Sequence, residues 1–218
     1  MPVYCICIAI GCLCAATAYK YADFPKRSKD PDAFIAGGFA LILGAKIPVW
    51  ISYGLSWETV VQGKSFAGAL IGAFLGLNLY KRLSGRTRSG FGSGFAIPLA
   101  IVAGFGKIGC FLAGCCAGRK TGMAFPEFYP AQLVESAFQF TAAFVLWRLY
   151  KRGMRPDRLF PLYAACYLTM RFFVEFIRTE PIVFAGLTVY QIAALGFIPV
   201  FVFLFKQRGT YGNHPDIG

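Results

Sequence analysis

The sequence predicts an all-α integral membrane protein in which a single domain, residues 1–218, crosses the bilayer with seven helices. Three observations lead to this fold class. Hydrophobic residues make up 57% of the chain and charged residues only 15%, whereas soluble domains carry about 25% charged residues. Apolar runs of about a bilayer's thickness recur along the chain. Lysine and arginine gather in alternate segments between these runs, as they do in multi-pass membrane proteins.

The apolar runs place the seven spans roughly at residues 3–19, 33–53, 65–80, 92–117, 131–150, 160–177 and 187–205. The first run lacks a preceding basic segment, so we interpret it as a span rather than a cleaved signal peptide. The second is a long apolar run that contains Lys46. The third carries a stripe of small residues at four-residue intervals, which favours close helix packing: Gly68, Gly72 and Gly76.

The fourth span contains Lys107 in the middle of an apolar stretch. A charge at the bilayer centre costs roughly 2.5–3.5 kcal/mol, so we expect this lysine to have a function. Glycines surround it and would let a ligand or another backbone approach closely: Gly104, Gly106, Gly109 and Gly114.

The fifth and sixth spans each align polar residues on one helical face. The start of the fifth span carries three such residues at helical spacing, Gln132, Glu135 and Gln139. The sixth span carries four, Tyr167, Arg171, Glu175 and Arg178. The seventh span is apolar and completes the predicted bundle.

The basic residues predict the orientation of the chain. Fifteen lysines and arginines fall in the first, third and fifth loops and the C-terminal tail, and only four in the other three loops. Because the more basic side of a membrane protein faces the cytoplasm, we expect the N-terminus outside and the C-terminus in the cytoplasm. The net charge of +12 therefore reflects membrane topology, and we expect no nucleic-acid partner.

The polar residues inside the spans suggest a site for an anion. Three cations, Lys46, Lys107 and Arg171, face two carboxylates, Glu135 and Glu175, and this excess of positive charge suits a phosphate. We expect an anionic phospholipid to bind between the second, fourth and sixth spans.

Structural roles for several of these residues are alternatives. Arg171 and Glu175 are spaced to form an ion pair that only fastens helices together. Arg178 could extend to lipid headgroups, and Lys46 and Gln132 could make contacts between helices only.

All eight cysteines fall within the predicted spans, so we expect them to be reduced, buried packing residues. Three of them lie within seven residues, Cys110, Cys115 and Cys116, and this spacing leaves a disulfide or a metal site as alternatives. We expect no metal there, because the spacing matches no common metal motif. The single histidine, His214, is predicted to be a solvated tail residue, so a histidine general base is not expected.

Five segments resemble, in order, motifs of the prolipoprotein diacylglyceryl transferase family. They are Gly44-Ala45-Lys46, the run from Gly63 to Gly72, the run from Gly106 to Arg119, the run from Tyr129 to Ser136, and the run from Tyr167 to Arg178. Gln191 resembles the glutamine that opens the last helix of family members. The resemblance covers roughly residues 33–205 and agrees with the predicted seven spans and outside N-terminus.

The resemblance implies an enzyme of lipoprotein biogenesis in the bacterial cytoplasmic (inner) membrane. Such enzymes move a diacylglyceryl group from phosphatidylglycerol to the thiol of a lipobox cysteine in a secreted precursor, and they use no metal or other cofactor. The implied catalytic residues are Lys107, Arg171 and Tyr167. The implied substrate-binding residues are Lys46, Gly118, Gln132, Glu135, Glu175 and Arg178.

The chain departs from the family pattern at several positions. Lysines replace two family arginines, at Lys46 and Lys107, and Ala67 and Tyr129 occupy two family histidine positions. The two asparagines and the glutamate of the family signature are Cys110, Ala113 and Cys115. The alternative function is a non-enzymatic lipid or anion carrier on the same scaffold, in which Glu135 or Glu175 would carry protons.

Overall fold

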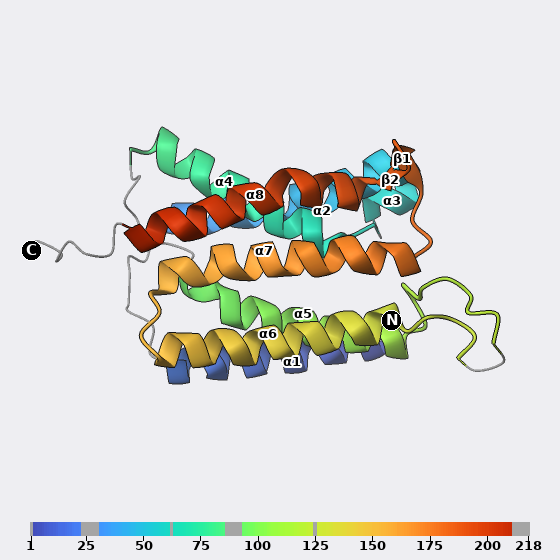
Figure 1. The fold of residues 1–218 in the computed structure, drawn as a ribbon, viewed down its shortest axis with the longest axis horizontal. Coiled ribbons are helices and arrows are strands. Elements are labelled where there is room, and N and C mark those ends of the chain that lie inside the picture. Colours follow the sequence, from blue (N-terminus) through green and yellow to red (C-terminus); the bar gives the residue numbers. More distant parts are fainter. Residues whose placement is uncertain (1, 23–30, 62, 86–92, 124–125, 211–218) are drawn as a thin grey trace, which may run out of the picture. The chain divides into compact units, whose positions relative to one another are not determined.

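A computed structural model describes residues 2–22, 31–61, 63–85, 93–123 and 126–210. Every predicted span contains a helix (Figure 1). The helices are α1 (Pro2–Ala22), α2 (Pro31–Tyr53), α3 (Trp57–Val61), α4 (Phe66–Leu83), α5 (Ala96–Leu112), α6 (Ala131–Lys151), α7 (Pro156–Val174) and α8 (Val189–Thr210). Two short 3₁₀ turns, Ser93–Phe95 and Glu175–Ile177, adjoin α5 and α7. Strands β1 (Ile182–Phe184) and β2 (Leu187–Thr188) form an antiparallel hairpin that the sequence analysis did not predict.

Four of the described helices are long and apolar enough to cross a membrane: Pro2–Ala22, Asp32–Tyr53, Pro156–Ile177 and Val189–Arg208. The fold is therefore that of a helical membrane protein. The helix predicted over 92–117 is shorter, because α5 ends at Leu112. α4 has 18 residues and α6 has 21, but both end in basic residues and α6 also begins with polar ones. Seven crossings therefore remain a prediction.

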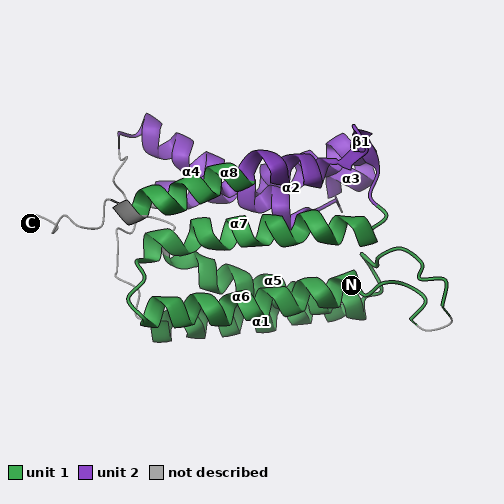
Figure 2. Cartoon of the chain, in the orientation of Figure 1, with its two compact units in different colours: residues 1–24, 92–179, 198–218 green, residues 25–91, 180–197 purple. Residues whose placement is uncertain are grey.

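The chain divides into two compact units (Figure 2). Unit 1 contains Met1–Phe24, Gly92–Thr179 and Ile198–Gly218, and unit 2 contains Pro25–Phe91 and Glu180–Phe197. In unit 1, α5 packs against both α1 and α6, and α6 packs against α7. The Ser136 hydroxyl donates to the Gly104 carbonyl at 3.0 Å, and the Tyr163 hydroxyl donates to Gln139 Oε1 at 2.7 Å. These two buried hydrogen bonds fix α6 against its neighbours in a membrane-embedded unit, where unpaired polar groups are costly.

In unit 2, α2 and α4 cross at glycines. A Cβ added to Gly44 would lie 2.5 Å from the Gly68 carbonyl oxygen and 2.6 Å from the Gly72 Cα, so only glycine allows this approach. The predicted stripe of small residues in the third span is thus confirmed as a helix-packing surface.

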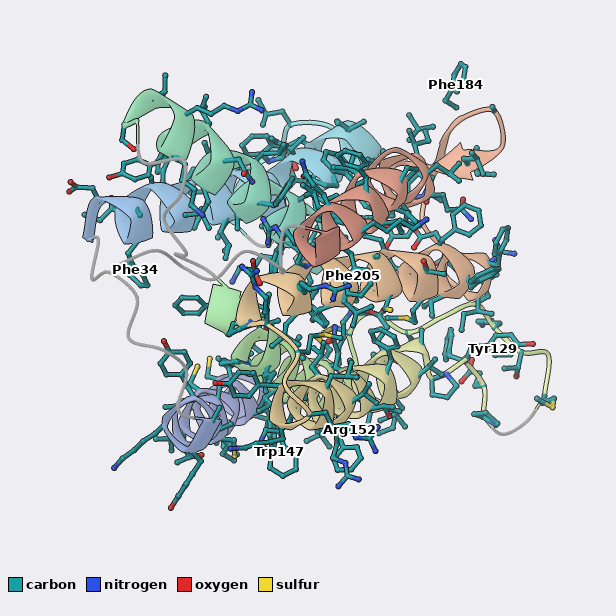
Figure 3. All side chains as sticks on the ribbon, turned by 60° about the vertical axis from the view of Figure 1, so that its left-hand side comes forward. Phe34, Tyr129, Trp147, Arg152, Phe184 and Phe205 are labelled. Atoms are coloured by element: carbon teal, nitrogen blue, oxygen red, sulfur yellow. The ribbon has the colours of Figure 1, made fainter. Side chains whose placement is uncertain are left out.

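The hairpin of unit 2 leads directly into α8. Its turn places Ala185 and Gly186 at positive φ, as a tight two-residue turn requires. Phe184 projects from its tip (Figure 3). At the start of α8, the Gln191 N–H donates to the Thr188 hydroxyl and the Thr188 N–H donates to Gln191 Oε1, at 3.3 and 3.1 Å. This reciprocal pair is a capping box, so Gln191 fixes the beginning of the helix.

Candidate phosphate-binding site

In unit 1, the end of α5, the beginning of α6 and the end of α7 lie at the same end of the helices (Figure 1), and ion pairs join their polar residues. Lys107 lies five residues before the end of α5, about 8 Å along the helix, Glu135 lies in the second turn of α6, and Arg171 lies in the last turn of α7. Because α6 runs antiparallel to α5 and α7, its beginning meets their ends. The basic residues that join α6 to α7 lie at the opposite end, and Figure 3 labels Tyr129 and Arg152 near the two ends of α6.

Glu135 is the centre of this cluster and is fully buried, with a side-chain exposure of 0%. Its Oε2 lies 2.7 Å from the Lys107 ammonium nitrogen. Its Oε1 lies 3.2 Å from Arg171 Nη1 and 3.4 Å from Arg178 Nη1. One carboxylate therefore holds three cations from three segments of the chain.

Arg171 also pairs with a second carboxylate, since its Nη2 lies 2.9 Å from Glu175 Oε2. The predicted ion pair between α7 and the turn that follows it is confirmed. The cluster contains three cations and two carboxylates, Glu135 and Glu175, so it carries one excess positive charge. A buried excess charge is unfavourable unless it is compensated, and a bound anion would compensate it.

Arg178 does not extend to the surface, because only 9% of the residue is exposed. Besides Glu135, its guanidinium donates to the Cys116 carbonyl at 3.2 Å. Its own carbonyl accepts a hydrogen bond from Arg119 Nε at 2.9 Å. The alternative of a headgroup-seeking arginine is therefore wrong in this structure, and Arg178 belongs to the buried cluster.

Gly118 allows three chain segments to meet beside the cluster. Its N–H donates to the Tyr129 carbonyl at 2.9 Å, and the next N–H, of Arg119, donates to the Ile177 carbonyl at 2.8 Å. A Cβ at Gly118 would lie 2.6 Å from the Ile177 oxygen and 2.8 Å from the Tyr129 oxygen. These neighbours are backbone atoms that cannot move aside, so the position requires glycine. Gly118 thus supports the backbone that carries Arg178, and its role in substrate binding stays a prediction.

Gln132 is buried at the start of α6. Its Nε2 donates to the Cys115 carbonyl at 2.7 Å, and this contact fixes the orientation of the amide. Its Oε1 is buried without a hydrogen-bond partner among the described residues. That oxygen is a ready acceptor for a hydroxyl group, because an unpaired buried acceptor costs about 1–3 kcal/mol.

Tyr167 lies one turn before Arg171 on α7 and is 1% exposed. Its ring lies 6.3 Å from that of Phe138 and is stacked 6.2 Å from that of Tyr163. It is therefore part of the aromatic core between α6 and α7, next to the cationic cluster along the helix.

Lys46 belongs to unit 2 and has different partners. Its ammonium donates to the carbonyls of Val60 and Val61, at 2.6 and 3.3 Å. These carbonyls end the short helix α3, so Lys46 caps that helix. The alternative of a structural Lys46 therefore has direct support in unit 2.

The prediction of buried cysteines is wrong for most of the eight, because only Cys7 is buried. Cys115 and Cys116 are exposed and lie beyond the end of α5, rather than buried within a span. Their Sγ atoms and that of Cys110 all lie within 4.8 Å of one another. The sequence showed that the three thiols are close along the chain, but their convergence depends on Cys116 adopting a positive φ of 63°, which no local signal predicts.

These features define a helical membrane protein with a buried, net-cationic site at one end of its helices. The family follows from comparison: residues 1–206 match the model of a family described as "Prolipoprotein diacylglyceryl transferase". The chain belongs to this family of transferases, which confirms the resemblance seen in its motifs.

Three relatives illustrate the relationship. The chain is 30% identical to phosphatidylglycerol--prolipoprotein diacylglyceryl transferase 2 of Clostridium perfringens, over 90% of this chain and 85% of that protein. It is 29% identical to phosphatidylglycerol--prolipoprotein diacylglyceryl transferase of Dehalococcoides mccartyi, over 74% of this chain and 69% of that protein. It is 38% identical to the enzyme of the same name from Clostridium tetani, over 38% of this chain and 39% of that protein.

Proposed function

We propose that this protein transfers a diacylglyceryl group from phosphatidylglycerol to the cysteine thiol of a prolipoprotein. Membership of the family and the names of its relatives support the substrates. The observation that carries the proposal is the cluster around Glu135, in which Lys107, Arg171 and Arg178 outnumber the buried carboxylates. A lipid phosphate is the anion that an enzyme with this substrate must hold.

Lys107 is the proposed principal phosphate ligand. Its side chain is 18% exposed, whereas that of Arg171 is 6% exposed, so its ammonium is the more accessible of the two cations. Glu135 and Glu175 fix the direction of the two charges before the lipid arrives, and such preorganised charges stabilise a transition state without reorganisation. Tyr167 is proposed as a hydroxyl donor one turn away, and the unpaired Gln132 Oε1 as an acceptor for a glycerol hydroxyl. A contact of Lys46 with the headgroup stays a prediction.

The proposed reaction forms one bond and breaks one bond. The sulfur of the acceptor cysteine attacks a glycerol carbon of the diacylglyceryl group, and the bond from that carbon to the phosphate oxygen breaks. Glycerol phosphate leaves with the electron pair of that bond, and the thiol proton ends on the glycerol phosphate or in solvent. Negative charge grows on the leaving phosphate as the bond breaks, so Lys107 and Arg171 would stabilise the transition state more than the bound lipid.

We also propose that the site faces the outside of a bacterial cytoplasmic membrane. In unit 1, basic residues gather at the end of α6, the beginning of α7 and the end of α8, opposite the Glu135 cluster. α1 begins and α8 ends at opposite ends of the helices of this unit, as an outside N-terminus and a cytoplasmic C-terminus require (Figure 1). By the positive-inside rule, this proposal puts the cluster near the outer surface, where a secreted precursor would present its cysteine.

The carrier alternative receives less support. A proton-coupled carrier needs an intramembrane carboxylate that can gain and lose a proton beside an open path. Glu135 pairs with three cations and Glu175 pairs with Arg171, so both carboxylates are already engaged in ion pairs.

A direct test uses the purified protein in micelles that contain phosphatidylglycerol, with a peptide bearing a lipobox cysteine. We expect the peptide to gain the mass of one diacylglyceryl group on sulfur, and we expect Lys107→Met to reduce this rate. Micelles of zwitterionic lipid alone provide the control and should give no product. Flux of phosphatidylglycerol across protein-containing liposomes without thioether formation would instead support the carrier.

Topology is testable in intact cells with a membrane-impermeant maleimide, with labelled positions identified by mass spectrometry. Cys115 and Cys116 should be labelled from outside in reduced, chelator-treated cells. A cysteine introduced by Ser84→Cys, at the end of α4, should be labelled only after the cells are permeabilised. Labelling of that cysteine in intact cells would contradict the proposed orientation.

A further inference from the structure

The end of α5 folds the chain back on itself and brings three thiols together. The Cys115 N–H donates to the Cys110 carbonyl at 3.0 Å, and the Gly114 N–H donates to the Phe111 carbonyl at 3.1 Å. With Gly114 at a φ of 68°, these two bonds form a Schellman motif that stops the helix. The thiol of Cys115 then lies 3.5 Å from the Cys110 carbonyl. The backbone thus holds Cys115 and Cys116, which follow Cys110 by five and six positions, close to that cysteine.

Cys116 extends this arrangement in an unusual backbone conformation. Its φ of 63° lies in the left-handed region, which is uncommon for a residue other than glycine. Its carbonyl is fixed by the hydrogen bond from Arg178, and the carbonyl of Cys115 is fixed by Gln132. The carbonyls of the two cysteines therefore accept hydrogen bonds from Gln132 and Arg178, while their thiols gather with that of Cys110.

The spacing of the three sulfur atoms is close to that of a metal–thiolate site. All three Sγ atoms lie within 4.8 Å of one another. A cation with metal–sulfur bonds of about 2.3 Å holds its sulfur ligands roughly 3.8–4 Å apart, so small rotations of the side chains would complete the set. The thiols are also accessible, because Cys115 and Cys116 are exposed and Cys110 is partly exposed.

The spacing of the cysteines along the chain led us to expect no metal, but from their geometry in space we propose that Cys110, Cys115 and Cys116 bind one thiophilic cation, of the class that includes Zn(II), Cd(II) and Cu(I). Three thiolate ligands suit these soft or borderline ions, whereas Mg(II) and Ca(II) prefer oxygen. The thiol protons are released to solvent as the cation binds. The site is separate from the transfer reaction, in which no step passes through it, and its role is to fix the loop that holds Gln132 and Arg178.

Cadmium provides the probe, because cadmium–thiolate bonds give an ultraviolet charge-transfer absorption. The purified, reduced protein is treated with chelator, exchanged into chelator-free buffer and titrated with Cd(II). We expect saturation at one ion per chain. Replacing two ligands together, Cys115→Ser with Cys116→Ser, should lower the Cd(II) affinity by more than roughly 100-fold. Losing even a residue that only hydrogen-bonds a metal ligand typically lowers metal affinity by about 10- to 100-fold.

A matched control replaces three exposed cysteines elsewhere, Cys5→Ser, Cys12→Ser and Cys166→Ser. This variant should bind Cd(II) like the unmodified protein. Cys115 lies beyond the end of α5, so the single variant Cys115→Ser should also weaken Cd(II) binding with little risk to folding. Thermal melting of each variant checks that it is folded. Unchanged binding by the double variant, or uptake without a one-to-one end point, would overturn the proposal.

Discussion

Lys107 and Lys46 are both lysines in apolar helices, yet their surroundings differ. Lys107 pairs with the buried carboxylate of Glu135, which two arginines share. Lys46 donates to two backbone carbonyls at the end of α3. A lysine in an apolar helix therefore indicates only that its ammonium has a polar partner. The kind of partner, a buried carboxylate for Lys107 and backbone carbonyls for Lys46, distinguishes a cationic cluster from a helix cap.

The largest effect is expected for Glu135→Gln, which removes the negative charge at the centre of the cluster while keeping its shape. Three buried cations would lose their common partner, and breaking a buried ion pair costs roughly 3–5 kcal/mol. We expect the free energy of unfolding in detergent to fall by about this amount. Glu127→Gln is the control, because the side chain of Glu127 is 62% exposed and its ion pair with Lys120 should contribute little. Equal stability of the two variants would show that Glu135 is not the centre of the cluster.

Lys107→Ala should follow in size. Losing a charge-assisted hydrogen bond costs about 1.5–3 kcal/mol, so lipid affinity or turnover should fall by roughly 10- to 150-fold. Lys107→Arg should keep or raise the transfer rate, because a guanidinium binds phosphate with two parallel hydrogen bonds. Initial rates of lipobox-peptide modification measure both variants, and a rate for Lys107→Arg as low as that for Lys107→Ala would argue against phosphate recognition.

Gly118→Ala tests whether the cluster around Glu135 depends on the close backbone packing at Gly118 as well as on its charges. The added methyl group would collide with the carbonyls of Ile177 and Tyr129, and such overpacking costs about 1–3 kcal/mol. We expect a lower melting temperature in detergent. The control is Gly38→Ala on α2, where a Cβ would meet nothing within 4 Å and a helical alanine is favoured. If the two variants melt alike, Gly118 is not a constrained position.

The smallest effect is expected for Lys46→Met. A cation at the end of a helix contributes about 0.3–1 kcal/mol, and α3 has only five residues. Stability should fall by no more than this amount, as measured by unfolding in detergent. A loss as large as that of Glu135→Gln would mean that Lys46 has a further, strongly interacting partner.

The sequence was informative wherever a pattern repeats. Apolar runs located the helices, and helical spacing located the Arg171–Glu175 pair and the glycine stripe of α4, because both follow from the helix period alone. The three-cation partnership of Glu135 could not be predicted, since tertiary packing brings α5, α7 and Arg178, just after the turn that follows α7, to the Glu135 carboxylate on α6. The sequence likewise gave no sign of α3 or of the hairpin, whose elements have five residues or fewer.

Cys110, Cys115 and Cys116 illustrate the same limit. Their position in an apolar run favoured buried packing. Their exposure and convergence result from the stop of α5 at Leu112 and from the positive φ of Cys116, and neither follows from the apolar pattern.

The central claim is that Lys107 holds the lipid phosphate, and Lys107→Met tests it most directly because the change keeps side-chain volume and removes the charge. Binding of phosphatidylglycerol to the detergent-purified variant should be compared with that of Lys46→Met and of the unmodified protein, after melting curves establish that all three are folded. The account predicts a loss of roughly 10- to 150-fold for Lys107→Met. It predicts a smaller loss for Lys46→Met, because the Lys46 ammonium donates to carbonyls at the end of α3. A folded Lys107→Met protein that binds phosphatidylglycerol as tightly as the unmodified protein would contradict it.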